Sequence, residues 1–258
     1  MLSIAGSDSG GGAGIQADLK AFAACGVHGM TAITAVTAQN TTVVTGVYPL
    51  PPGAIIEQVR AVAADIGVDA VKIGMLGSAE TIRAVAAALD LVGDAPVVID
   101  PVMVAESGGR LLDEDAVDAL RQLLLPRAAV VTPNVLEARI LAQDPGAEPA
   151  ALARAIHALG PRAVVVTGGH REQAIDTFYD GDQLVEIPGE RHPDGAAHGS
   201  GCTHSSALAA WLARGATPLE AARHAKGLAS QAVRDGLRDI GHGPGPVDAL
   251  GIAQGRVP

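Results

Sequence analysis

The sequence contains few aromatic residues and almost no cysteine. Phe, Trp and Tyr together make up 2% of its 258 residues, while apolar residues make up 48%. A core must therefore be built mainly from Ala, Val, Leu and Ile. The two cysteines, Cys25 and Cys202, are too few for a disulfide framework and favour a reducing compartment.

Long apolar runs are absent as well. No stretch is long enough to cross a bilayer as a helix, and the chain opens on Leu2 and Ser3 without the pattern of a signal peptide. The formal net charge of −10 argues against nucleic acid or an anionic membrane as the main partner, although it allows a local basic pocket for a phosphate. We therefore expect a cytoplasmic protein with no nucleic-acid and no membrane partner.

Several common catalytic motifs are missing too. The chain has no C-x-x-C, H-E-x-x-H or G-x-S-x-G pattern. No lysine follows a glycine, so there is no Walker A loop. Residues 12–17 fit the loose dinucleotide fingerprint, but residues 34–40 lack the acidic side chain that would bind a ribose. A dehydrogenase is therefore disfavoured, and a protein that used ATP would hold its phosphates elsewhere.

The sequence does contain a regular alternation of short apolar segments with helical ones. Strands are predicted at residues 2–5, 30–38, 41–48, 70–73, 97–99, 129–131, 163–166, 174–179 and 183–187. Helices are predicted at residues 15–24, 54–66, 79–91, 114–125, 149–159 and 203–214, and others open at Pro133 and after Thr217. This alternation indicates an α/β fold with a mainly parallel sheet and helices on both faces. No linker or repeat divides the chain, so we expect one domain over residues 1–258.

One glycine turn is notable because a predicted helix follows it at once. Residues 198–204 read His-Gly-Ser-Gly-Cys-Thr-His. A glycine turn at a helix N-terminus binds anions, because its free N–H groups and the helix dipole favour negative charge. Cys202 at such a site is predicted to have a lowered thiol pKa and to be a candidate base. The alternative is a tight turn with Cys202 as a small buried side chain.

Other polar segments follow predicted strands, at the sheet edge where ligands bind in this fold class. The glycine loop at residues 6–14 is predicted either to close over a small substrate, with Asp18 facing it, or to be a simple strand–helix turn. A second glycine turn, at residues 167–170, is a further candidate phosphate site. Asn134 and Glu137 share the first turn of one helix and suit Mg²⁺, which Asp100 could share. A solvated helix start is the alternative for that pair.

Taken together, these motifs resemble one family of small-molecule kinases. The matching stretches occur in family order over most of the chain: residues 4–20, 37–41, 72–76, 100–105 with Ser107 and Gly108, 132–134 with Glu137 and Ala138, 168–170, and 198–203. They resemble the hydroxymethylpyrimidine and phosphomethylpyrimidine kinases of thiamine biosynthesis, a branch of the ribokinase superfamily. Thr167, where lysine is common, and residues 189–197 depart from the family pattern.

The resemblance implies a single ribokinase-like domain that transfers the γ-phosphoryl group of ATP, with Mg²⁺, and we expect a homodimer. The implied substrate is 4-amino-5-hydroxymethyl-2-methylpyrimidine and then its monophosphate. A pyridoxal or pyridoxine kinase of the same branch is the nearest alternative, and a ligand-binding protein that keeps the fold without catalysis is another.

The resemblance also implies roles for individual residues. Cys202 would be the catalytic base, and Gly199, Ser200 and Gly201 would complete the anion hole and contact ATP. The pyrimidine pocket would be lined by Gly6, Ala13, Asp18, Gln39, Met75 and Val102. The nucleotide would contact Asn134, Thr167, Gly168, Gly169 and Lys226. The metal would be held by Glu137 and Asp100.

Overall fold

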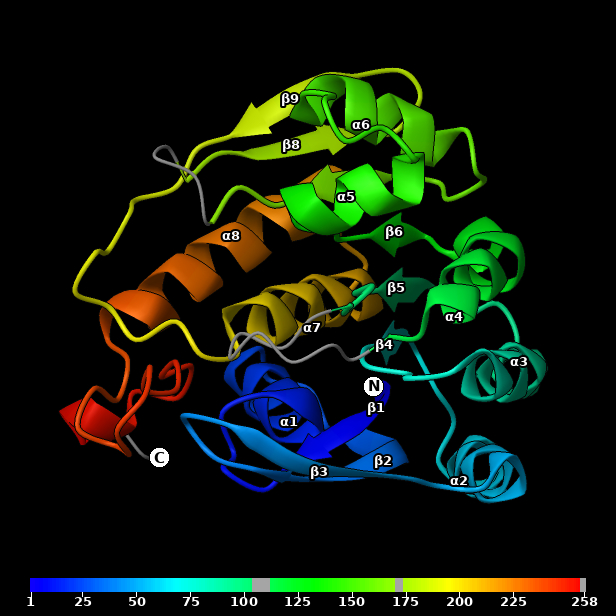
Figure 1. The fold of residues 1–258 in the computed structure, drawn as a ribbon, viewed down its shortest axis with the longest axis horizontal. Helices are drawn as coiled ribbons and strands as arrows, with labels where there is room; N and C mark the ends of the chain where they lie inside the picture. The colour runs from blue at the N-terminus through cyan, green and yellow to red at the C-terminus, as the bar shows by residue number, and fades with distance from the viewer. Residues whose placement is uncertain (104–111, 170–173, 256–258) are drawn as a thin grey trace.

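The structure is a computed structural model that describes residues 1–103, 112–169 and 174–255. In these residues one nine-stranded sheet runs between two layers of helices (Figure 1). Its strands are β1 (Leu2–Asp8), β2 (Met30–Gln39), β3 (Val44–Pro49), β4 (Val71–Ile73), β5 (Val97–Ile99), β6 (Val130–Val131), β7 (Val164–Val166), β8 (Asp176–Tyr179) and β9 (Leu184–Ile187). The α-helices are α1 (Gly14–Ala24), α2 (Pro52–Asp65), α3 (Ala79–Ala88), α4 (Glu114–Ala119), α5 (Val135–Ala142), α6 (Pro149–His157), α7 (Ser200–Ala213) and α8 (Pro218–Arg234).

The sheet has the order β3-β2-β1-β4-β5-β6-β7-β8-β9. The strands from β2 through β1, β4, β5 and β6 to β7 are parallel to their neighbours, whereas β3 at one edge and the β8–β9 hairpin at the other are antiparallel. The predicted α/β class with a mainly parallel sheet is therefore confirmed. This arrangement brings the carboxyl ends of the parallel strands to one edge.

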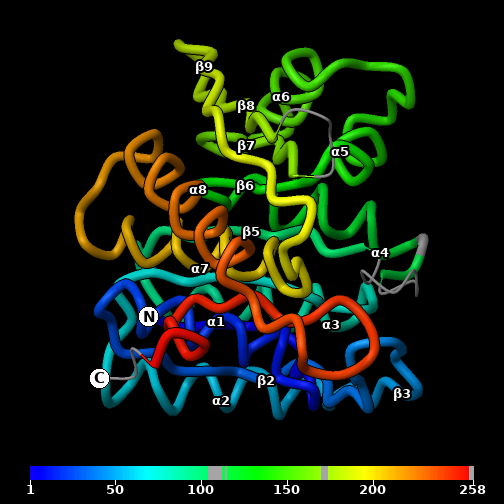
Figure 2. Tube along the Cα trace, turned by 90° about the vertical axis from the view of Figure 1, so that its left-hand side faces the viewer, coloured from blue at the N-terminus to red at the C-terminus, as the bar shows by residue number. Residues whose placement is uncertain are grey.

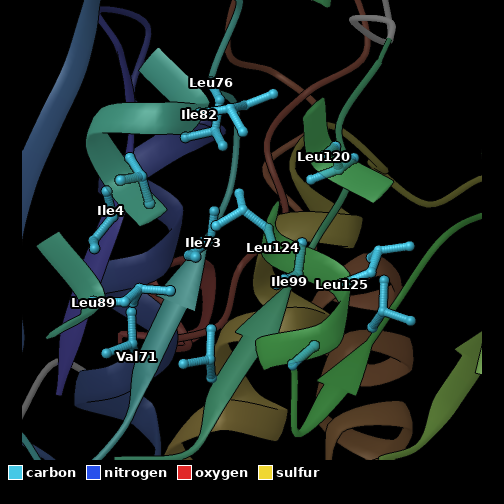
Figure 3. Packing of buried hydrophobic residues seen from close by; sticks show 14 of the residues in the cluster. Ile4, Val71, Ile73, Leu76, Ile82, Leu89, Ile99, Leu120, Leu124 and Leu125 are labelled. Atoms are coloured by element: carbon cyan, nitrogen blue, oxygen red, sulfur yellow. The ribbon is translucent and has the colours of Figure 1, made fainter. Parts of the chain in front are cut away.

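The two faces of the sheet are covered by different helices. One core cluster joins the strands to α2, α3, α5 and α6, and the other joins them to α1, α7 and α8. Side chains alternate between the faces, as a strand requires: Val71 and Ile73 of β4 pack in the first cluster with Ile99 (Figure 3). Lys72, between them, therefore points toward α1 and α7. Alanines of α7 and α8 dominate that face, which lets both helices lie close to the sheet.

Several predicted helices, including those at residues 54–66, 79–91 and 149–159, differ from the observed ones by a few residues at their ends. The helix predicted at residues 114–125 is α only to Ala119 and then widens to a π turn before Pro126, because proline cannot continue the α-helical hydrogen bonds. The helix predicted from residue 203 already begins at Ser200, directly after Gly199. Part of the predicted 100–105 motif, with Ser107, Gly108 and His170, lies outside the described residues.

Candidate active site

Most of the predicted site residues lie at the carboxyl ends of the parallel strands. Gln39 ends β2, Asp100 follows β5 directly, and Thr167 follows β7. Met75 comes shortly after β4. Asp8, at the end of β1, joins them although the sequence analysis assigned it no role. Residues far apart in sequence therefore meet at the edge where ligands bind in this fold class.

The predicted glycine turn is present and opens α7. Gly199 has φ of +83°, and a Cβ at that position would collide with the carbonyl oxygen of Gly12. Only glycine fits such a backbone and such a contact. The N–H groups of Ser200 and Thr203 donate to the carbonyls of Ala197 and Gly199. The turn is thus tightly packed against the first glycine loop.

The remaining donors of this turn belong to Gly201 and Cys202. Within residues 1–103, 112–169 and 174–255, neither backbone N–H has an acceptor. The hydroxyl of Thr203 is also buried without a partner in that part of the chain. Unpaired donors at the N-terminus of a helix suit an anion such as a phosphate group.

Cys202 lies half-buried in the first turn of α7, but its electrostatic surroundings differ from the prediction. Burial raises the pKa of the thiol to about 12, although the Lys72 ammonium and the N–H of Gly14 favour the thiolate. The carboxylates of Asp18 and Asp100 act in the same direction as burial. The predicted lowering of this pKa is therefore wrong. The sequence revealed the helix N-terminus but neither the burial nor the two carboxylates.

Asp8 connects the two glycine loops, a role that the sequence analysis missed. Its carboxylate accepts hydrogen bonds from the N–H groups of Gly10, Gly12 and Ala13, and its Oδ2 lies 3.0 Å from Nε2 of His198. Burial alone would raise the pKa of Asp8, but these hydrogen bonds hold it below its ordinary value. An aspartate between a strand and a glycine run was visible in the sequence, but its distant partner was not.

Asp18 lies beneath the first glycine loop and has no accessible surface. Its Oδ1 accepts hydrogen bonds from Lys72 Nζ at 2.8 Å and from Ser206 Oγ at 2.7 Å, and its Oδ2 accepts one from Ser3 Oγ. The expectation that Asp18 faces a substrate is therefore not met. The ion pair with Lys72 draws the carboxylate toward the sheet instead.

Gln39 lies half-buried beside a small cavity. The cavity measures about 230 Å³ and is lined by Gln39, Asn40, Thr41, Thr42, His198, Gly243 and Pro244. Gly243 and Pro244 of this lining belong to the C-terminal segment, whose trace passes across the N-terminal half of the molecule in Figure 2. The N–H groups of His242 and Gly243 both donate to Thr41 Oγ1 at 3.2 Å. The predicted ring-reading glutamine thus has a recess beside it, next to the contact between the glycine loops.

The other predicted ring contacts lie near the start of α1 and after β4 and β5. Gly6 is buried, whereas Ala13, Met75 and Val102 are half-buried. A side chain on Gly6 would collide with the end of the Met75 side chain, so Met75 packs directly over this glycine. The Met75 carbonyl accepts a hydrogen bond from Thr34, which fixes the segment after β4.

Asn134 and Glu137 form the capping box of α5. Asn134 Oδ1 accepts the Glu137 N–H, and Glu137 Oε2 accepts the Asn134 N–H. Glu137 Oε1 also accepts the N–H of Met103. The helix-start alternative from the sequence is therefore present, although Glu137 is buried rather than solvated.

Asp100 is the second buried carboxylate on this side. Its Oδ2 accepts a hydrogen bond from Ser205 Oγ at 3.0 Å and lies 4.0 Å from the Cβ position of Gly201, beside the first turn of α7. Burial raises the pKa of Asp100. Burial, and to a smaller extent the Asp100 carboxylate, raise the pKa of Glu137 to about 8. Two buried carboxyl groups that resist ionisation together would suit a divalent cation, whose charge could replace their protons.

No group of three or more His, Cys, Asp or Glu side chains in the described chain is arranged to hold a metal. A cation near Asp100 and Glu137 would therefore need oxygen atoms from phosphates and water. Mg²⁺ commonly binds in that way, through one or two carboxylates and substrate phosphates. The residues present fit such an ion.

Asp176 organises the predicted nucleotide side and was also missed. Its Oδ1 accepts hydrogen bonds from Lys226 Nζ at 2.7 Å and from the N–H of Gly168 at 2.9 Å. Its Oδ2 lies 3.3 Å from Nε2 of His204. Burial alone would raise the pKa of Asp176, but His204, Lys226 and Gly168 hold it below its ordinary value. The second glycine turn, α7 and α8 therefore meet at one carboxylate.

The nucleotide candidates also border a larger cavity. Thr167 is half-buried, and its N–H donates to the Pro133 carbonyl beside Asn134, whereas Gly169 is exposed. A cavity of about 760 Å³ lies between the segment after β9 and α8. Its lining comprises Glu186, Ile187, Pro188, Gly189, Glu190, His192, Arg223, Lys226, Gly227, Ser230, Gln231 and Arg234. Its volume is within the range of about 300–1,000 Å³ typical of ligand pockets.

None of the described helices is long and apolar enough to span a membrane. The order of the sheet, its parallel centre and the glycine turn that opens α7 are those of a ribokinase-like kinase. An ADP complex of Bacillus subtilis pyridoxal kinase superposes with a TM-score of 0.89 and 38% identity, covering 97% of each chain. The phosphomethylpyrimidine kinase of Clostridium difficile 630 gives 0.76 and 38%, covering 87% of this chain and 96% of that one.

Sequence comparison narrows the class to one family. The family model for phosphomethylpyrimidine kinase matches residues 8–248. A hydroxymethylpyrimidine/phosphomethylpyrimidine kinase of Rhizobium meliloti (strain 1021) is 52% identical over 254 residues, which are 95% of each chain. The chain therefore belongs to the phosphomethylpyrimidine kinase family, and the predictions of this family and of a phosphotransferase are confirmed.

Proposed function

We propose that this protein transfers the γ-phosphoryl group of ATP to the hydroxymethyl group of 4-amino-5-hydroxymethyl-2-methylpyrimidine, and then phosphorylates the resulting monophosphate. The diphosphate would enter thiamine biosynthesis. The observation that carries the proposal is the junction of the two glycine loops in a chain of this family. There Cys202 and the free donors of α7 lie beside the buried carboxylate of Asp100.

The first turn of α7 would hold the transferring phosphoryl group. The backbone N–H groups of Gly201 and Cys202 are its free donors, and Gly199 gives the turn its left-handed start. Ser200 is half-buried in the same turn and would contact ATP. Fixed donors of this kind stabilise the charge that develops on a phosphoryl group during transfer.

Cys202 is the proposed base for the first phosphorylation. Its thiolate would accept the proton of the substrate hydroxyl while the hydroxyl oxygen bonds to the γ-phosphorus. The bond from that phosphorus to the bridging oxygen would break, and ADP would leave with the electron pair. Because burial raises the thiol pKa to about 12, this role requires that bound substrates lower it. If they do not, Cys202 shapes the anion turn without taking a proton.

Asp100, Glu137 and Asn134 would hold Mg²⁺ together with phosphate oxygens of ATP. The ion, when bound, supplies positive charge to the phosphates. Asp100 lies beside the α7 turn, and its carboxylate raises the pKa of Glu137, which supports a common region for the two carboxyl groups.

The nucleotide would extend from the α7 turn toward Lys226. Asp176 ties Lys226 to Gly168, so Thr167, Gly168 and Gly169 would form the second phosphate turn. The cavity of about 760 Å³ beyond Lys226 contains Arg223 and Arg234 and has room for the rest of the nucleotide.

The pyrimidine ring would lie at the opposite side of the α7 turn. Gln39 would read the ring from the end of β2, with Gly6, Ala13, Met75 and Val102 as its other contacts. Asp18, which is occupied by Lys72, Ser3 and Ser206, would support this pocket from beneath.

A pyridoxal or pyridoxine kinase is the second candidate, which the superposition on the Bacillus subtilis pyridoxal kinase favours. The test is ATP consumption with the pyrimidine alcohol, its monophosphate, pyridoxal and pyridoxine as separate substrates, with each product identified by mass spectrometry. Consumption with the pyridine rings alone would reject the proposed substrate. Consumption with none of them would reject both candidates.

We also propose that the chain works as one domain over residues 1–258, as a homodimer in the cytoplasm. The continuous sheet from β3 to β9 supports a single domain. Light scattering of the purified protein tests the dimer, and a monomer at micromolar concentration would contradict it.

A further inference from the structure

Lys72 lies under the candidate active site with its whole side chain inaccessible to solvent. Its Nζ lies 2.8 Å from Asp18 Oδ1, and Asp18 is equally inaccessible. Burial alone would lower the pKa of Lys72, but the Asp18 carboxylate raises it above its ordinary value, so the lysine is charged. A buried ion pair is often no more stable than an apolar pair of the same volume. Its presence under the site therefore calls for a reason other than stability.

The same ion pair is attached to the helix that carries Cys202. Asp18 Oδ1, which accepts from Lys72, also accepts from Ser206 Oγ at 2.7 Å. Ser206 lies one helical turn after Cys202 on α7, and Asp18 lies one helical turn after Gly14 on α1. The distance along the helix from Cys202 to Ser206 therefore equals that from Gly14 to Asp18. The N–H of Gly14 lies against the Cys202 sulfur. The two helices thus run in parallel, and their N-termini meet at the thiol.

The charged groups around the thiol come from three elements. Lys72 on β4 favours the thiolate, whereas Asp18 on α1 and Asp100 after β5 favour the thiol. Among the described residues that act on Cys202, Lys72 is the cation, and its influence exceeds that of either carboxylate. The position of the thiol and the charge beside it therefore depend on one buried pair.

We propose that Lys72 and Asp18 are positioning residues for Cys202, with Lys72 supplying the positive charge that offsets the thiolate and Asp18 holding α1, α7 and the lysine in register. This inference rests on the proposed function in one respect, which is that the Cys202 thiolate acts as the base for the first phosphorylation. When Cys202 accepts the substrate proton, the charge of the thiolate disappears, and the Lys72–Asp18 pair remains neutral overall. No further reactant is needed.

The experiment measures the alkylation of Cys202 by iodoacetamide in the ligand-free protein between pH 8 and 10, with peptides quantified by mass spectrometry. The rate follows the fraction of thiolate. Lys72→Met should slow the reaction by about tenfold or more, and Asp18→Asn should accelerate it by a similar factor, since one pKa unit is tenfold in thiolate. Asp100 would help to keep Lys72 charged in Asp18→Asn.

Cys25 is an internal control in every variant. It is 4% exposed, it follows α1, and the charge near it belongs to Arg214 rather than Lys72. Faster alkylation of both cysteines would indicate a loosened fold, so only the ratio of the two rates is informative. Ser3→Ala, which removes a neutral hydrogen bond to Asp18, should lower stability without changing that ratio.

A double variant keeps the test available if a single variant does not fold. Lys72→Met combined with Asp18→Asn removes both charges of the pair. Proteins tolerate this better than the loss of one partner, which leaves the other charge buried and unpaired. Its Cys202 should still react more slowly than in the unmodified protein, because the influence of Lys72 is the larger one. A Cys202-to-Cys25 ratio that is unchanged, or that moves in the same direction in both single variants, would overturn the proposal. Because no substrate is involved, this result is independent of whether the proposed kinase activity is found.

Discussion

Asp8 and His198 are separated by 190 positions in the chain, yet Oδ2 of Asp8 lies 3.0 Å from Nε2 of His198. This contact joins the loop after β1 to the turn before α7. On one side the Asp8 carboxylate holds three backbone N–H groups of its own loop. On the other, His198 precedes Gly199, whose backbone touches Gly12. The two glycine loops therefore behave as one unit, and the geometry of the anion turn depends on both.

Asp8→Asn should destabilise the protein by about 1–3 kcal/mol at neutral pH, because buried N–H groups lose a charged acceptor. The pKa of Asp8 is lower in the folded protein than in the unfolded chain. The charged carboxylate therefore stabilises the fold above the unfolded-state pKa of about 3.9, and this stabilisation is lost as the pH falls toward the folded-state pKa. The difference between the two proteins should therefore shrink below about pH 4. Urea unfolding at several pH values measures it.

Asp180→Asn is the matched control, because Asp180 also accepts N–H groups and also has a lowered pKa, but in the surface hairpin between β8 and β9. It should leave phosphoryl transfer unchanged. A stability difference for Asp8→Asn that is the same at pH 7 and pH 3 would mean that the charge of Asp8 is not what holds the loops.

Glu137→Gln should raise the Mg²⁺ concentration needed for half-maximal activity much more than the KM for the pyrimidine. The amide can still accept a hydrogen bond from Asn134 but lacks the negative charge that attracts a cation. Initial rates over a Mg²⁺ titration at fixed ATP measure the effect. Glu220→Gln, at the same position of the capping box of α8, is the control and should leave the Mg²⁺ requirement unchanged. An unaltered requirement in Glu137→Gln would restrict Glu137 to helix capping.

Gln39→Leu should lower kcat/KM for the pyrimidine by about 10- to 100-fold, because a buried polar group left unpaired costs about 1–3 kcal/mol. As the proposed ring reader, the amide of Gln39 would offer a donor and an acceptor to the aminopyrimidine edge. The matched control is Gln58→Leu, since Gln58 also hydrogen-bonds to β2, at Ile33, but from α2. It should change stability and leave substrate preference intact. Full activity in Gln39→Leu would assign ring recognition to other residues.

The fold was largely predictable because its signals are local. The apolar runs of β4, β5 and β7 identify strands, and Gly199 and Gly201 mark the start of α7. The capping box of α5 was visible as Asn134 with Glu137, but nothing local showed that Glu137 is buried next to Asp100. Burial depends on which strands are neighbours, and the pattern of elements does not give the sheet order.

The partners of the charged residues were not predictable for the same reason. Lys72 pairs with Asp18 because β4 lies beside β1 and its middle residue points toward α1. A lysine inside an apolar strand was the available signal for a buried ion pair. Asp176 contacts Lys226 only because β8 pairs with β7 and α8 covers that end of the sheet. The surroundings of Cys202 combine both cases, which is why its raised pKa contradicts the prediction.

Cys202 should matter differently for the two phosphorylation steps. The first acceptor is a primary alcohol, a poor nucleophile until its proton leaves. The second is a phosphate monoester whose second pKa is about 6 by analogy with phosphorylated side chains, so it is largely a dianion at neutral pH and needs no base. Cys202→Ala should therefore slow the alcohol step by about 10²- to 10⁴-fold, as expected for loss of a general base. The monophosphate step should slow much less.

Kinetics on the alcohol and on its monophosphate, measured separately with the same preparation, test this difference. Cys25→Ala removes the other cysteine, which lies at the far end of α1, and should leave both rates unchanged. Both steps are proposed to use the backbone donors of Gly201 and residue 202. Alanine retains its backbone N–H, so Cys202→Ala should keep the anion turn itself. Equal losses on the two substrates would mean that the side chain of Cys202 shapes this turn and, with its raised thiol pKa, accepts no proton.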